Sequence, residues 1–120
     1  MNQIGEKIDV DNFPKTHLPL YPEETRKQLF AFGNIKVLSW GANNWQALNY
    51  GNGDFYFLRF SVTGRKFRGH IYIVLNPSDT YDVYYCTSHG TIKMISNGLY
   101  FDQLTEVIDN KIERVPEYKH

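Results

Sequence analysis

Apolar and polar residues change their spacing several times along the chain, and each spacing predicts a different element. In "YPEETRKQLFAFGN", Pro22 suits the first turn of a helix, and two glutamates follow it at the positive end of the helix dipole. Apolar residues then gather before Gly33, which favours a helix stop. This segment predicts a helix over residues 22–32.

After Gly33 the apolar spacing becomes two, which is typical of strands. The segments "NIKVLSW" and "NWQALNY" predict a first strand with a bulge or bend at Gly41. Four further strands are predicted by "FYFLRFSV", "HIYIVL", "YDVYYCTS" and "TIKMIS". Asn52-Gly53 is typical of a tight hairpin turn, and the other connections are also short, so neighbouring strands should pair antiparallel.

The last periodic segment, "YFDQLTEVIDNKIERV", carries Phe101, Leu104, Ile108 and Ile112 at spacings of three and four. Charged residues occupy its other positions, which predicts an amphipathic helix. The predicted fold is therefore α+β: an N-terminal helix, a five-stranded antiparallel meander sheet and a C-terminal amphipathic helix. The helices should cover one sheet face, and the other face is only partly apolar.

Residues 1–21 show no clear period and contain prolines, so we expect an N-terminal arm across the surface. Residues 22–114 should form a single domain, followed by a tail over 115–120. This order of elements resembles cystatin-like and helix-grip architectures in outline. No motif accompanies that resemblance, and an outline carries no function by itself.

Composition places the chain among globular proteins, since 42% of its 120 residues are hydrophobic and its formal net charge is zero. Its single cysteine, Cys86, cannot form an internal disulfide. The N-terminus lacks the apolar core of a signal peptide, and no apolar run is long enough to cross a membrane. We expect a cytoplasmic protein without membrane contact. The abundance of Asn, Ile, Lys, Tyr and Phe suggests an accessory protein of a bacterium or phage.

Charge is distributed unevenly despite the neutral total. No Asp or Glu occurs from Phe55 to Ser78, whereas the same span holds Arg59, Arg65, Lys66, Arg68 and His70, with Phe67 among them. Basic residues interleaved with an aromatic fit an acidic protein surface, and they also fit single-stranded nucleic acid, where rings stack on bases. The same residues equally fit a solvated turn whose charges keep a sheet edge from aggregating.

A second contact region is predicted at Asn43, Asn44 and Trp45, where a polar neighbourhood suits a partly exposed ring. The favoured function is a non-catalytic interaction module that binds an acidic macromolecular partner, a protein before a nucleic acid. Edge strands and the part-apolar second face also favour a two-fold homodimer.

Catalytic chemistry has little support in the sequence. Cys86 has His89 nearby in the chain and His70 on a neighbouring strand, but neither spacing is a nucleophile or metal signature. Asp54, Asp79 and Asp82 lie at or near turns, where Asp has a local structural role. We expect no cofactor and no metal. A small enzyme or ligand-binding protein remains the alternative, with a tyrosine-lined pocket under a curved sheet.

Overall fold

The fold was analysed in a computed structural model, which describes residues 2–14, 20–50 and 55–113. Its elements, in chain order, are η1 (Val10–Asn12), α1 (Pro22–Ala31), α2 (Asn34–Ser39), β1 (Asn43–Tyr50), β2 (Phe55–Thr63), β3 (Arg68–Leu75), β4 (Tyr81–Cys86), β5 (Ile92–Leu99) and α3 (Leu104–Ile112). The Asn52-Gly53 turn and the tail over 115–120 lie outside the described residues.

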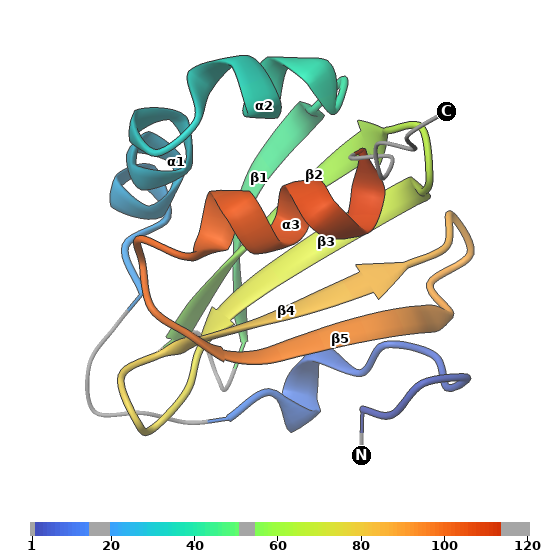
Figure 1. The fold of residues 1–120 in the computed structure, drawn as a ribbon. Helices are drawn as coiled ribbons and strands as arrows, with labels where there is room; N and C mark the ends of the chain where they lie inside the picture. The colour runs from blue at the N-terminus through green and yellow to red at the C-terminus, as the bar shows by residue number, and fades with distance from the viewer. Residues whose placement is uncertain (1, 15–19, 51–54, 114–120) are drawn as a thin grey trace.

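The five strands form one sheet in sequence order, and each neighbouring pair is antiparallel. The predicted α+β meander with a helix at either end is therefore confirmed. Figure 1 shows the three helices on one side of the sheet, with α3 crossing its strands. The N-terminal segment with η1 lies away from the helices. The predicted coverage of one sheet face by helices is confirmed as well.

The first predicted strand is partly wrong, because Asn34–Ser39 forms the helix α2 and only Asn43–Tyr50 extends as β1. Six residues are too few for spacing to separate a strand from a helix. Tertiary packing selects the helix instead. In α2, Val37 is buried, while Ile35 and Leu38 are exposed to solvent. A Cβ on Gly33 would lie 2.6 Å from a methyl carbon of Thr105, so glycine lets α3 approach closely here.

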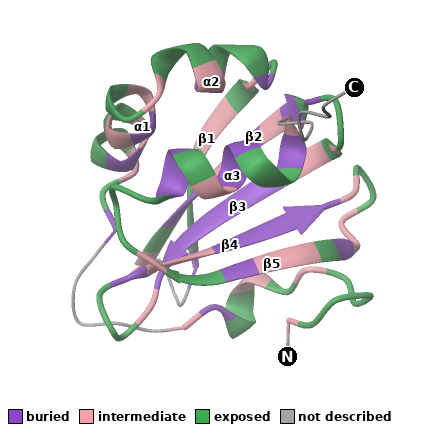
Figure 2. Cartoon of the chain, viewed as in Figure 1, coloured by how far each residue is buried: buried purple, intermediate pink, exposed green. Residues whose placement is uncertain are grey.

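The main core lies between the sheet and the helices. Alternate residues of β2, β3 and β4 point into it, and α3 contributes Leu104, Ile108 and Ile112, all fully buried. Figure 2 shows the central strands β3 and β4 buried over most of their length. These three residues form the buried stripe expected from the spacing of three and four. Phe101, which the prediction included, lies before α3 and is 48% exposed.

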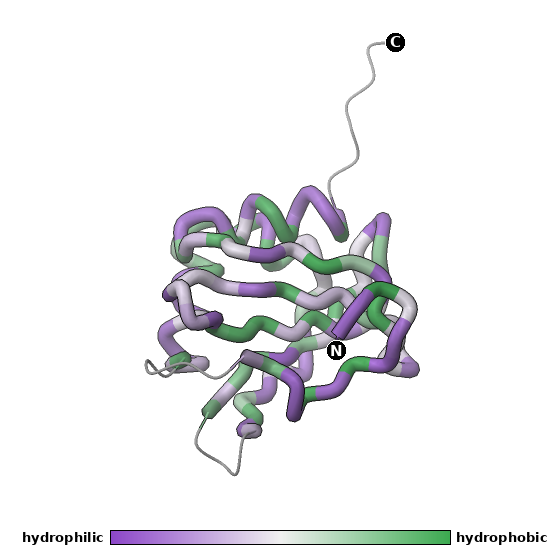
Figure 3. Tube along the Cα trace, turned by 90° about the horizontal axis from the view of Figure 1, so that it is seen from below, coloured by the Kyte–Doolittle hydropathy of each residue, from purple (hydrophilic) through white to green (hydrophobic). Residues whose placement is uncertain are grey.

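A second, aromatic core lies on the opposite face of the sheet. Phe13 of the N-terminal arm is 1% exposed and packs on the rings of Phe57 and Tyr84, at 5.2 and 5.3 Å between centroids. Figure 3 shows hydrophobic and hydrophilic positions alternating along the chain trace in a view from below. The partly apolar face predicted from the sequence is thus covered in part by the chain's own arm.

Candidate functional site

The β2–β3 hairpin, which carries much of the predicted basic surface, rests against the end of α3. A Cβ on Gly64 would lie 2.2 Å from the carbonyl oxygen of Ile112, so only glycine permits this approach. The backbone N–H of Lys66 donates to the same carbonyl at 2.9 Å. This bond satisfies a carbonyl at the helix end that has no intrahelical donor.

The side chains of the hairpin tip strengthen this contact. Arg65 Nε lies 3.3 Å from Glu113 Oε2, and the Arg65 backbone N–H donates to Glu113 Oε1 at 3.0 Å. Lys66 Nζ donates to the carbonyl of Asn110, where the negative end of the helix dipole favours a cation. Both predicted binding residues therefore hold the hairpin on α3, although Arg65 remains 74% exposed.

Phe67 also turns toward the helix side of the sheet. It packs at the margin of the main core, with its ring edge-on to Tyr85 at 6.2 Å between centroids. The predicted basic and aromatic group is thus divided, because Arg65, Lys66 and Phe67 lie with the helices.

Arg59, Arg68 and His70 lie on the opposite sheet face. The β2–β3 register pairs Ser61 with His70 and Thr63 with Arg68, and Arg59 precedes Ser61 by two. Paired residues of antiparallel strands share a face, and so do residues two apart. This surface, Arg59, Ser61, Thr63, Arg68 and His70, is called the basic face below. Arg68 and Thr63 are exposed and the other three are part-exposed.

Arg59 is held in place on the basic face by its neighbours. Its Nη1 donates to Gln46 Oε1 at 2.6 Å, its Nε donates to the Tyr72 hydroxyl at 3.2 Å, and its guanidinium lies 5.6 Å from the centre of the Tyr72 ring. Burial, and secondly the charge of Arg59, lower the pKa of His70. The positive charge of this face at neutral pH therefore comes from its two arginines.

The Asn43–Trp45 corner combines an exposed bend with a packed ring. Asn44 has a φ of 57°, and the β1–β2 register shifts between Asn43 and Gln46. The bulge turns Trp45 onto Phe60, stacked at 4.2 Å between centroids. Asn43 and Asn44 remain exposed, while the Trp45 ring belongs largely to the main core.

Cys86 and His70 are paired across β3 and β4, as a nucleophile with its base would be. The thiol is fully buried, however, and burial raises the pKa of Cys86 to about 12. It is therefore protonated at neutral pH and cannot act as a thiolate. Within residues 2–14, 20–50 and 55–113, no three His, Cys, Asp or Glu side chains are grouped to hold a metal ion.

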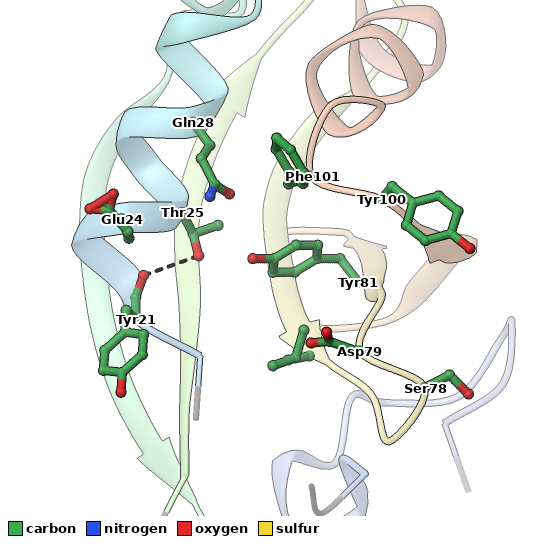
Figure 4. Close-up of a pocket in the computed structure, with 10 residues that line it drawn as sticks. Tyr21, Glu24, Thr25, Gln28, Ser78, Asp79, Tyr81, Tyr100 and Phe101 are labelled. Atoms are coloured by element: carbon green, nitrogen blue, oxygen red, sulfur yellow. Dashed lines mark hydrogen bonds between the residues drawn. The ribbon is translucent and has the colours of Figure 1, made fainter. Parts of the chain in front are cut away.

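A half-open cavity of about 520 Å³ lies between α1, the beginning of β4 and the residues that follow β5. Figure 4 shows its walls, which are formed by Glu24 and Gln28 of α1, Asp79 and Tyr81 of the β3–β4 region, and Phe101 before α3. Among the described residues, its lining includes the tyrosines Tyr21, Tyr81 and Tyr100. The cavity joins segments far apart in the sequence, and no local pattern in the sequence locates it.

The turn between β3 and β4 fixes one wall of this cavity. The Asp79 N–H donates to the Asn76 carbonyl at 3.0 Å, and the Ser78 N–H donates to Asn76 Oδ1 at 2.9 Å. Asp79 itself has a φ of 64°, a conformation that Asp and Asn tolerate better than most residues. The carboxylate of Asp79 is therefore carried on a turn with a defined backbone.

Comparison with models of protein families, with curated proteins and with solved structures found no match for this chain. None of the helices in the described part of the chain is long and apolar enough to cross a membrane.

Proposed function

We propose that the protein is a non-catalytic interaction module that binds an acidic macromolecular partner through the basic face. The observation that carries the proposal is the β2–β3 register, which puts Arg59, Arg68 and His70 on the sheet face opposite α1, α2 and α3. No acidic residue occurs between Phe55 and Ser78, so neither strand offsets this charge locally. Complementary charge of this kind favours an acidic surface and speeds encounter with it.

A protein partner fits better than single-stranded nucleic acid. Binding of unpaired bases relies on exposed rings that stack on them. The rings nearest Arg59 on this face, Phe57 and Tyr72, are only 2% and 7% exposed, because the N-terminal arm packs over the aromatic core. The net charge of zero also gives no general attraction for phosphate.

The proposal includes a cytoplasmic location, in keeping with a buried free thiol at Cys86. It replaces the hairpin tip with the basic face as the principal contact. We give Arg65 and Lys66 the smaller part in binding because their contacts with Glu113 and Asn110 hold the hairpin on α3.

Affinity capture with the wild-type chain as bait, followed by the same capture with Arg68→Glu, tests the proposal. The variant should lose the acidic partner, with at least a tenfold loss of affinity for the purified partner. The matched control is Arg65→Glu, which reverses the same charge at the hairpin tip and should keep the partner. Equal retention by Arg68→Glu, or loss only with Arg65→Glu, would reject the basic face.

A nucleic-acid partner would be recognised in the same samples. Its binding should weaken steeply as salt concentration rises, and nuclease treatment should remove it.

A further inference from the structure

The cavity between α1 and the β3–β4 turn has a chemical character distinct from that of the basic face. Its described lining contains no Lys, Arg or His and includes two acidic residues, Glu24 of α1 and Asp79 of the β3–β4 turn. Negative charge at a half-open cavity favours entry of a positively charged group.

One acceptor at the cavity wall has no hydrogen-bond partner. Gln28 Oε1 is buried from water and receives no donor in the described structure. Figure 4 shows the Gln28 side chain reaching from α1 toward Tyr81 and Phe101. A buried carbonyl oxygen left unpaired costs free energy, and an N–H donor that reached it would recover that cost.

The remaining walls are aromatic. The Tyr81 hydroxyl points across the cavity toward α1, and Phe101 lies beside it. Burial, opposed by a hydrogen bond with Thr25 and reinforced by the negative charge of Asp79, raises the pKa of Tyr81. Tyr81 therefore stays a neutral phenol. Aromatic faces next to carboxylates attract ammonium and guanidinium groups.

We propose that this cavity binds an ammonium or guanidinium group carried on an aliphatic chain. Asp79 supplies the opposite charge, Glu24 at the rim adds to the negative potential, and Gln28 Oε1 accepts an N–H bond. Tyr81 and Phe101 cover the aliphatic stem and the cation. The group belongs either to a free small amine or to a Lys or Arg side chain of a peptide, and the chemistry recognised is the same in both cases.

Titration calorimetry and NMR shift mapping on the full chain would test the proposal. The free probes are cadaverine and agmatine, and the peptide probes are end-blocked Gly-Lys-Gly and Gly-Arg-Gly. The neutral controls are 1-pentanol and end-blocked Gly-norleucine-Gly, which keep the stem and lack the charge. The cationic probes should saturate and shift the signals of Gln28, Asp79 and Tyr81, while the neutral controls should not.

Asp79→Asn is the sharpest variant, because Asn retains both the shape and the tolerance for a positive φ at this turn. It should weaken binding of the cationic probes about tenfold. Asp11→Asn removes the same charge from the N-terminal arm, outside the cavity lining, and should leave binding unchanged. Arg68→Glu should also leave it unchanged, because the basic face is a separate surface.

Two outcomes support the proposal and identify the source of the cation. Tighter binding of agmatine or cadaverine indicates a free amine, and tighter binding of a blocked peptide indicates a side chain. Three outcomes overturn it: no saturable shift at the cavity with any cationic probe, equal binding of the neutral controls, or unchanged affinity in a folded Asp79→Asn protein. None of these depends on whether the basic face binds an acidic partner.

Discussion

Lys66 and Arg68 are two positions apart, yet their side chains are used differently. Lys66 donates to the last turn of α3, while Arg68 lies on the basic face. Close packing at Gly64 bends the hairpin tip onto Ile112, and this bend separates the two cations. Basic residues that lie close together in the sequence therefore need not form a single basic surface in the folded protein.

His70 gives a prediction at the residue scale. Its pKa in the folded chain is lowered from 6.5, so the unfolded chain binds a proton at a higher pH than the folded chain does. The free energy of unfolding should therefore fall as the pH is lowered below about 6.5, until the folded pKa is passed. In urea denaturation at several pH values, the free energy of unfolding should depend less steeply on pH in His70→Gln than in the wild-type protein. An identical pH profile in the two proteins would contradict the assignment.

At the scale of elements, backbone hydrogen bonds tie the N-terminal arm to the β4–β5 turn and to the start of β5. The Ile8 N–H donates to the carbonyl of Gly90 and the Ile92 N–H donates to the carbonyl of Glu6, each at 2.8 Å. Phe13 then fills the aromatic core on the same face. The arm thus covers part of this face of the sheet, as the helices cover the opposite face.

Removal of the Phe13 ring should therefore release the arm. Phe13→Ala is expected to lower the free energy of unfolding by about 3 kcal/mol, from the lost burial and the cavity left behind. Faster hydrogen exchange at the Ile8 amide would show the release directly. Ile4→Ala is the control, since Ile4 is 65% exposed and its change should stay within about 0.5 kcal/mol. A stability loss no larger than this control would contradict the role of Phe13.

At the scale of the whole molecule, the sheet ends in β1 on one side and β5 on the other. The N-terminal arm covers the beginning of the β5 edge, where Lys7 forms an isolated antiparallel bridge with Thr91. Strand β1 is the other edge of the described sheet, and Leu48 on it is 37% exposed. An edge with apolar side chains is suited to pairing with another strand.

We therefore propose a two-fold dimer in which β1 pairs with β1 of a second copy. Light scattering should show a mass rising with concentration from 14.1 kDa toward twice that value. Leu48→Lys should keep the mass at that of one chain, because a charge on an edge strand opposes pairing. Ile4→Lys adds the same charge elsewhere and should still dimerise. A wild-type mass of one chain at every concentration would contradict the dimer.

The sequence was sufficient for the elements with long or clear periods. Spacings of three and four specified α3 from Leu104 on, and alternation specified the core-facing residues of β3 and β4 and most of those of β2, because these patterns follow directly from backbone geometry. The segment Asn34–Ser39 was misread, since six residues fit either period until Val37 and Gly33 are packed against their neighbours.

The sequence identified Arg59, Arg68 and His70 as candidate binding residues without showing that they share a face, and it did not locate the cavity. Arg59 and His70 share a face only because of the β2–β3 register, and the cavity joins Gln28, Asp79 and Phe101 from segments distant in the chain. Local spacing determined which residues are helical or extended, since that depends on near neighbours. Tertiary packing alone decided which polar groups meet, because contacts between distant segments are set by how the helices, the arm and the sheet close around the two cores.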